Sequence, residues 1–282
     1  MKKLIFILLI STNIYVISQN NKTDPKYIIN KMHESINKYN QLRFSLYRSE
    51  RSGDEYIVGS FDAKLQSEPY KFYLKNIIPS KGSEILYIEG ANNGKAWVNP
   101  NSFPFITLSL KPENSLLLAG GHHTIKEAGF MFFNKMFISY KKKYKEKVFD
   151  YLTYKGLISS KGIKYHKFIM NNPDYRFLSY TVKSGENLQN IALKRLLNIA
   201  KLKELNPSYN DTEIIPTGTK IKITSTYAQK AIFMLDVKSY LPVYQEIHDE
   251  KGIYEKYFYT NVITNKPILD EEFSTKYAAY NF

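Results

Sequence analysis

The 282-residue chain contains no cysteine. Disulfide bonds, thiolate metal sites, cysteine nucleophiles and lipid attachment to an N-terminal cysteine are therefore excluded. Glycine and proline are modest in number, at 13 and 11 residues, so the chain is neither collagen-like nor of low complexity. Beyond residue 18 no stretch of about 20 residues is free of charge, and we expect no membrane-spanning helix in the mature protein.

The start of the chain has the pattern of a signal peptide. Lys2 and Lys3 precede an unbroken apolar run over residues 4–10, and the small residue Ser18 follows. A basic start, a short apolar core and a small residue near the cleavage point are typical of a leader that is removed on export. We therefore expect residues 1–18 to be cleaved and the mature protein to be soluble in the periplasm or otherwise outside the cytoplasm.

The formal net charge is +14. In an exported protein such a charge points to anionic lipid head groups or cell-wall polymer, and we expect no nucleic acid partner. A general richness in lysine explains the charge equally well without any partner.

Aromatic residues make up 15% of the chain and favour a structure dominated by sheets. Asp24 followed by Pro25 predicts the start of an amphipathic helix. From Phe44 to Asn99, apolar and polar residues alternate between turn signals, which predicts a series of short antiparallel strands.

The middle of the chain combines an apolar loop with a helical pattern. Residues 100–121 carry proline and a glycine pair among apolar residues; such a segment folds back over a core or, functionally, covers an apolar pocket. Thr124 and Glu127 form a capping box that predicts helical structure reaching about Lys155. Strand patterns return from residue 163.

Residues 180–224 have few aromatics and an order of strand, two short helices and strand. Their pattern consists of Tyr180-x-Val182-x-x-Gly185, Leu188-x-x-Ile191-Ala192, Leu205-Asn206-Pro207 and Ile214-x-x-x-Gly218-x-x-Ile221-x-Ile223. The apolar positions face one small core, Gly185 allows a tight turn, and Asn206-Pro207 ends the second helix. This segment resembles the LysM family of glycan-binding modules, which implies a small βααβ domain.

The LysM resemblance also implies a site. Such modules hold N-acetylglucosamine-containing chains, such as peptidoglycan, in a shallow groove between two loops. One wall would be formed by Gly185, Glu186, Asn187 and Leu188, and the other by Asp211, Glu213, Ile214 and Ile215. Glu186 and Asn187 depart from the usual Asp then Thr or Ser, although the Asn187 amide can hydrogen-bond a sugar amide. The alternative is a module kept for packing or protein contact.

The two ends of a LysM module emerge close together, because its strands pair. The module can therefore replace the tip of a hairpin at little loop-closure cost. We expect residues 163–179 and 228–248 to be neighbours, and the host to be one discontinuous domain of about 20–179 and 225–282.

The host carries a series of weak motifs over most of its length. They are Glu68-Pro69-Tyr70-Lys71-Phe72-Tyr73, Tyr87-Ile88-Glu89-Gly90, Asn93-Gly94-Lys95, Val98-Asn99-Pro100, Gly121-His122-His123-Thr124, Leu241-Pro242-Val243 and Glu272-Phe273-Ser274. In this order they resemble an uncharacterised family of bacterial envelope proteins within the lipoprotein-carrier (LolA/LolB-like) superfamily. The resemblance implies an α+β fold, in which a curved antiparallel half-barrel sheet wraps an apolar cavity closed by covering helices.

Such a cavity would suit acyl chains. The residues expected to line it are Phe61, Phe72, Leu74, Ile85, Tyr87, Phe103, Phe105 and Leu108. The partner would be a lipid, a lipoprotein or an apolar protein segment. The alternative is an ordinary solid core made of the same residues.

The sequence shows no catalytic constellation. His122 and His123 are adjacent and so seldom reach one metal, and no HExxH-like spacing completes a site; hydrogen bonding or capping is the expected role. Ser35-x-x-Lys38 lacks the partner motifs of a penicillin-recognising enzyme. We expect no cofactor and no metal, and a non-catalytic protein that binds peptidoglycan and an apolar ligand. The alternatives are a cell-wall remodelling enzyme targeted by its LysM module, or a scaffold of an envelope complex.

Overall fold

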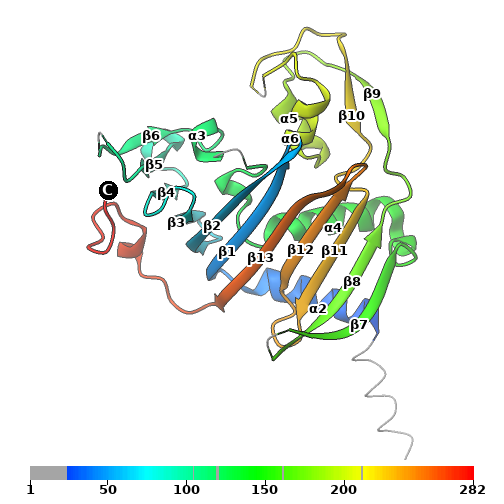
Figure 1. Cartoon of the computed structure of the whole chain (residues 1–282), viewed down its shortest axis with the longest axis horizontal. Coiled ribbons are helices and arrows are strands. Elements are labelled where there is room, and N and C mark those ends of the chain that lie inside the picture. The colour runs from blue at the N-terminus through cyan, green and yellow to red at the C-terminus, as the bar shows by residue number, and fades with distance from the viewer. Residues whose placement is uncertain (1–23, 104, 119–120, 161, 211) are drawn as a thin grey trace, which may run out of the picture.

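The computed structural model describes residues 24–103, 105–118, 121–160, 162–210 and 212–282. The signal peptide predicted over residues 1–18 lies outside these ranges. The described chain forms one large curved sheet with helices against it, and a small separate unit at one end of the strands (Figure 1). The predicted α+β fold with a curved antiparallel sheet and covering helices is confirmed.

The large sheet has eleven strands in the order β6-β5-β4-β3-β2-β1-β13-β12-β11-β8-β7, and each neighbouring pair is antiparallel. The strands are β1 (Gln41–Ser52), β2 (Glu55–Gln66), β3 (Lys71–Ile78), β4 (Glu84–Ile88), β5 (Ala96–Asn99), β6 (Leu108–Leu110), β7 (Leu152–Ser160), β8 (Ile163–Asn171), β11 (Lys230–Asp236), β12 (Pro242–Asp249) and β13 (Gly252–Thr264). The series of antiparallel strands predicted between Phe44 and Asn99 corresponds to β1–β5.

Two longer helices, α2 (Pro25–Lys38) and α4 (Met131–Tyr144), lie against one face of the sheet (Figure 1). Asp24 caps α2 as predicted, because its carboxylate accepts a hydrogen bond from the backbone N–H of Lys26 at 3.0 Å. The shorter helical segments are α3 (Ser115–Leu118) and the 3₁₀ turns Asn92–Gly94, Ile125–Glu127, Lys145–Phe149 and Asp270–Phe273.

The second helical stretch ends earlier than predicted. The backbone N–H of Thr124 donates to Glu127 at 2.9 Å, but this box closes only a 3₁₀ turn, and the helical structure stops at Phe149. Lys155 lies in strand β7 instead. Here the buried side chain of Leu152 alternates with exposed neighbours and pairs with Met170 of β8, so sheet pairing outweighs the local helical pattern.

Residues 177–224 form the small unit, which we call the insert. Its elements are β9 (Phe177–Thr181), α5 (Leu188–Arg195), α6 (Ile199–Leu205) and β10 (Lys220–Thr224), with β9 and β10 paired antiparallel. Its separate core is formed by Val182, Leu188, Ile191, Ala192, Leu197, Leu202, Ile215, Ile221 and Ile223. Gly185 has a backbone φ of 74°, which an L side chain seldom adopts. The predicted βααβ arrangement is therefore confirmed.

In the chain, the insert lies between two strands of the large sheet. The chain leaves the large sheet after β8 and returns in β11, and these two strands pair with Asn171 opposite Lys230. The neighbours predicted on both sides of the insert are thus paired strands of one sheet.

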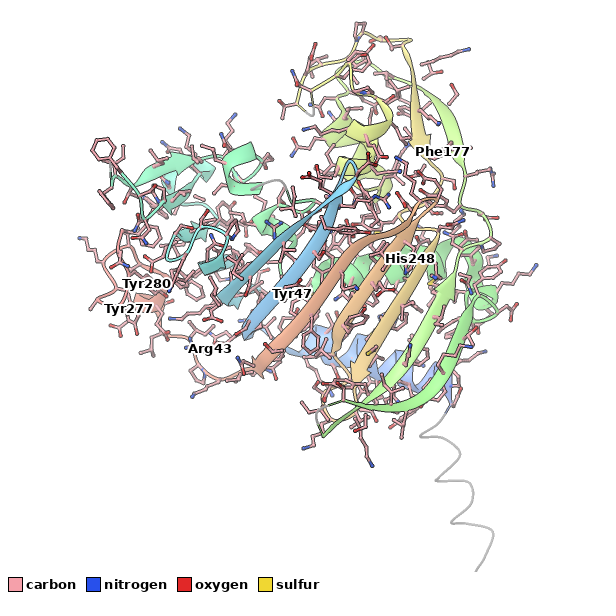
Figure 2. All side chains as sticks on the ribbon, viewed as in Figure 1. Arg43, Tyr47, Phe177, His248, Tyr277 and Tyr280 are labelled. Carbon is pink, nitrogen blue, oxygen red and sulfur yellow. The ribbon has the colours of Figure 1, made fainter. Side chains whose placement is uncertain are left out.

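The C-terminal segment covers the outer face of β3–β5. Tyr280 stacks on Tyr73 with ring centroids 3.8 Å apart, and Glu272 accepts a hydrogen bond from Arg43 at 2.8 Å. Figure 2 shows Tyr277 and Tyr280 of this segment. Because this segment buries one face of these strands, their other face is left to line an interior space.

Candidate functional site

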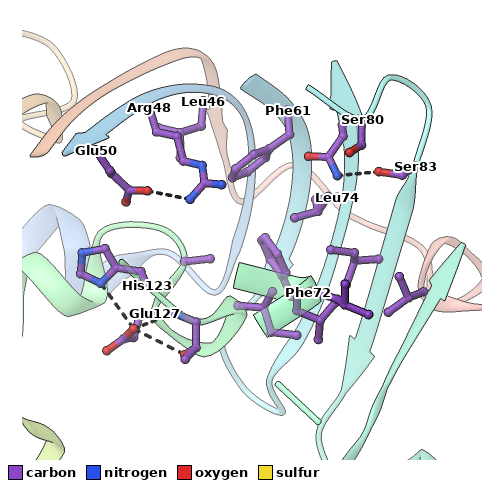
Figure 3. A pocket seen from close by; sticks show the side chains of 18 of the residues that line it. Leu46, Arg48, Glu50, Phe61, Phe72, Leu74, Ser80, Ser83, His123 and Glu127 are labelled. Atoms are coloured by element: carbon purple, nitrogen blue, oxygen red, sulfur yellow. Dashed lines mark hydrogen bonds and ion pairs between the residues drawn. The ribbon is translucent and has the colours of Figure 1, made fainter. Parts of the chain in front are cut away.

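A cavity of about 330 Å³ lies against the inner face of strands β1–β6 (Figure 3). Its apolar lining includes Leu46, Phe61, Phe72, Leu74, Ile85, Val98, Leu108, Leu110, Leu116, Leu117, Ile125, Phe132, Phe133 and Tyr259. The period of two along a strand explains this lining, since Phe72 and Leu74 face the cavity while Tyr73 between them faces the C-terminal segment. Among the covering residues, Leu116 and Leu117 come from the loop over 100–121 that was expected to fold back, and those from Thr124 to Phe133 come from the segment predicted to be helical.

The structure brings five of the eight predicted cavity residues together. Phe61, Phe72, Leu74, Ile85 and Leu108 all line the cavity. Their predicted contact with a ligand remains a prediction.

The other three residues lie elsewhere. Tyr87 is buried on the same face but packs against Tyr70, with ring centroids 6.1 Å apart. Phe103 and Phe105 do not line the cavity and are 87% and 72% exposed. The expectation that they cover it is wrong, because a turn closed by the Phe105 N–H donating to the Ser102 carbonyl at 2.7 Å leaves both rings exposed.

One end of the cavity is charged, a feature that was not predicted from the sequence. Arg48 and Glu50 line it and form an ion pair at 2.7 Å, and the Tyr257 hydroxyl also donates to Glu50 (Figure 3). Gly121 packs so closely here that a Cβ atom would stand 1.6 Å from the Arg48 guanidinium. The sequence does carry a signal for this charged end. Every second residue of this strand faces the same side, and on that side the apolar Phe44 and Leu46 are followed by the charged Arg48 and Glu50.

A buried network of hydrogen bonds adjoins this end. Glu255 of β13, which is 1% exposed, contacts His122 at 2.9 Å and His123 at 3.5 Å, and accepts a hydrogen bond from the Tyr227 hydroxyl at 3.0 Å. His123 also lines the cavity and contacts Glu127 at 3.3 Å.

Charges in this network shift its pKa values. Burial lowers the pKa of His123, but the Glu255 and Glu127 carboxylates outweigh burial and hold it well above its usual range. Burial raises the pKa of Glu255, and His123 and His122 more than reverse this, so it lies below its usual range. His123 thus lies between two carboxylates that favour its charged form.

The predicted glycan-groove residues lie at the end of the insert that carries the turn before α5. The side-chain amide of Asn187 donates to the Thr212 carbonyl at 3.2 Å, and the backbone N–H of Ile215 donates to the Glu186 carbonyl at 2.9 Å. These bonds bring the two predicted walls together. Asp211 lies outside the described residues.

The side chains of the predicted groove residues differ in their exposure to solvent. Leu188 and Ile215 are buried in the core of the insert, and only their backbones can face a ligand. Glu186 is also buried, accepting hydrogen bonds from the Tyr180 hydroxyl at 2.8 Å and the Lys183 N–H at 2.9 Å. Ile214, at 58% exposure, offers an apolar side chain to solvent.

Buried polar contacts fix the insert to the sheet. The Lys201 ammonium of α6 binds Asp249 at 2.9 Å and Glu250 at 2.6 Å, both at the turn between β12 and β13. The side-chain amide of Asn198 donates to Glu255. Because these groups are largely buried, moving the insert would break several charged contacts in the interior.

Comparison with known proteins identifies two regions. Residues 180–224 match the LysM domain family. The insert is a LysM domain. Residues 39–151 match a family described as a protein of unknown function, DUF1571. Both matches agree with the resemblances drawn from the sequence. Among curated proteins, none matches this chain in sequence.

Several solved structures are similar to this chain. The lipoprotein LppX from Mycobacterium tuberculosis is 11% identical, with 88% of this chain and 99% of that chain covered and a TM-score of 0.40. LprF from Mycobacterium bovis is 9% identical, with 89% and 95% covered and a TM-score of 0.40. A LolA superfamily protein from Nitrosomonas europaea is 11% identical, with 89% and 98% covered and a TM-score of 0.34.

Within the described ranges, no helix has the length and apolar character needed to cross a membrane.

Proposed function

We propose that this protein is exported, binds peptidoglycan through its LysM domain, and binds a lipid, a lipoprotein or an apolar protein segment in the cavity of the host sheet, without catalysing a reaction. In this proposal residues 1–18 are a cleaved leader, and the host is one discontinuous domain of about 20–179 and 225–282. The observation that carries the proposal is the apolar cavity beside a LysM domain in one chain.

The glycan half rests on the groove of the LysM domain. Asn187 holds the two loops together, and Ile214 presents an exposed apolar surface on which a sugar ring can pack. The predicted contacts by Gly185, Glu186, Leu188 and Ile215 would be made by their backbone groups, because glycine has no side chain and the other three are buried. We propose N-acetylglucosamine-containing glycan as the ligand.

The apolar half rests on the shape and chemistry of the cavity. Its volume lies at the lower end of the range of about 300–1,000 Å³ for small-molecule sites. Most of the wall is apolar, whereas Arg48, Glu50, His123 and Glu127 make one end polar. This division suits an amphiphile with its acyl chain among Phe61, Phe72 and Leu74 and its polar group at the charged end.

The histidines support a binding role over catalysis. The His122 ring contacts Glu255 and the Arg51 carbonyl, each at 2.9 Å. The His123 ring contacts Glu127 at 3.3 Å and the Tyr227 hydroxyl at 3.0 Å. Both nitrogens of each ring are therefore engaged in contacts within the protein, as buried polar groups of a structural network are.

The two halves are tested on the full mature chain. We expect it to be retained by insoluble peptidoglycan, and an organic extract of the purified protein to contain lipid by mass spectrometry. Deleting residues 180–224 is a poor control because it also removes Lys201 and Asn198, which are buried partners of Asp249 and Glu255. Failure of retention would refute the proposed peptidoglycan binding. A lipid-free protein that binds no added fatty acid would refute the proposed binding of an apolar ligand. Glycan turnover abolished by His122→Ala or His123→Ala would instead support the wall-enzyme alternative.

A further inference from the structure

A second hollow, a cleft of about 1140 Å³, lies between the LysM domain and the host. One wall comes from the LysM domain and includes Gln189, Tyr209 and Thr212. The opposite wall comes from the host and includes Lys95 and Lys111 at the ends of β5 and β6. Polar and aromatic groups on both walls suit a hydrated, extended ligand more than an acyl chain.

The cleft begins where the predicted glycan groove ends. Thr212 lines the cleft, and its carbonyl is the acceptor for the Asn187 amide that joins the two groove loops. Gln189 lines it as well and directly follows the groove residue Leu188. The predicted groove and the cleft therefore adjoin.

The host wall presents two facing lysines. In the β5–β6 ladder Ala96 lies opposite Leu110, so Lys95 and Lys111 occupy the next facing position. Like charges directly opposite each other repel, and across the described ranges no carboxylate forms an ion pair with either ammonium group. The wall's own carboxylate, Glu113, is paired with Lys126 at 3.8 Å.

The cleft also has a fixed geometry. Lys201 and Asn198 hold α6 to the sheet through buried contacts with Asp249 and Glu255. Arg51, which also lines the cleft, is held by Asp249 as well. The two walls thus face each other across a preformed space, and binding need not pay the entropy of bringing them together.

We propose that this cleft binds the acidic peptide that a peptidoglycan glycan carries, with its carboxylates accepting hydrogen bonds from Lys95 and Lys111 while the sugar occupies the LysM groove. The inference rests on the proposed glycan function and adds a preference for peptide-bearing glycan over bare N-acetylglucosamine chains. Charge-assisted hydrogen bonds to two ammonium groups supply that preference.

The test is calorimetric titration of the full mature chain with two probes. One is an N-acetylglucosamine oligomer, and the other is a peptidoglycan fragment with the same number of sugars that carries its peptides. We compare the Lys95→Glu/Lys111→Glu variant with a Lys238→Glu/Lys266→Glu control, which makes the same change of net charge at exposed lysines outside the cleft.

We expect the wild-type protein and the control to bind the peptide-bearing fragment more tightly than the bare oligomer. The cleft variant should bind that fragment about tenfold more weakly and the bare oligomer unchanged. Equal wild-type affinity for the two probes, or a preference that survives in the cleft variant, would overturn this inference and leave glycan binding in place. A wild-type protein that binds neither probe would overturn both proposals.

Discussion

Asn198 of the LysM domain and Glu255 of strand β13 are hydrogen-bonded in the interior of the protein, although 57 positions separate them in the chain. The Asn198 amide nitrogen donates to Glu255 and to the Tyr227 hydroxyl, while its side-chain oxygen accepts from the Lys201 N–H at 3.1 Å and caps α6. One side chain therefore both starts a helix of the LysM domain and fixes that helix to the host.

Replacing Asn198 by Asp separates these two roles. The carboxylate keeps the helix cap but loses the donor and stands beside the Glu255 carboxylate. We expect the free energy of unfolding to fall by about 2–4 kcal/mol, measured by urea denaturation. Asn187→Asp is the matched control, since Asn187 caps α5 without a buried carboxylate partner, and should change stability by less than about 1 kcal/mol. Equal effects at both caps would contradict the role given to Glu255.

His123 should make the protein less stable at alkaline pH. Its folded-state pKa is raised above the usual 6.5 by Glu255 and Glu127 in spite of burial, so its contribution is complete below 6.5 and is lost as the pH rises through the raised value. In His123→Gln this alkaline loss should be smaller, as measured by urea denaturation between about pH 6 and 10.

His33 serves as a control, because its pKa is shifted in the opposite direction to that of His123. Burial lowers its pKa below 6.5, so its contribution is lost as the pH falls. His33→Gln should alter the acid side of the stability profile and leave the alkaline side as in the wild type. The role of His123 is refuted if both substitutions change the same side.

Filling the cavity should block the apolar ligand. Leu74→Trp places a larger side chain in the space beside Phe72 and Ile85, and we expect binding of a fluorescent fatty acid to weaken at least about tenfold. Phe105→Trp introduces the same residue outside the cavity and should bind as the wild type does. The melting temperature of both variants checks that folding is retained. Similar affinities in the two variants would place the ligand elsewhere.

Two adjacent isoleucines should behave differently. Ile214 is 58% exposed in the predicted groove, whereas Ile215 is fully buried at 0%. Ile214→Ala should weaken binding of an N-acetylglucosamine oligomer about fivefold by calorimetry, with little change in stability. Ile215→Ala should instead lower the free energy of unfolding by about 2–5 kcal/mol. Unchanged glycan binding in Ile214→Ala would remove this side chain from the site.

Local sequence patterns predicted the structure where the contacting residues lie close together in the chain. The apolar positions from Val182 to Ile223 identify the LysM domain because its core is made within 45 consecutive residues. The alternation along β3 likewise identifies Phe72 and Leu74 as one face. The side-chain period of a strand determines that choice without knowledge of its neighbours.

Local sequence patterns did not predict the direction of side chains whose orientation depends on a turn. Of the apolar loop, Phe103 and Phe105 are exposed, while Leu116 and Leu117 take part in the cavity lining. Composition shows that a loop is apolar but does not show which side chains point inward.

By itself, the sequence determined the LysM domain, the antiparallel strands, and the apolar faces that enclose the cavity, because each follows from residue periods and turn residues close together in the chain. Only the tertiary structure decided that Arg48 and Glu50 meet His123 at one end of that cavity, and that Asn198 meets Glu255 beneath the LysM domain. The physical reason is that a buried charge is tolerated only with its partners, and those partners come from strands and helices far apart in sequence.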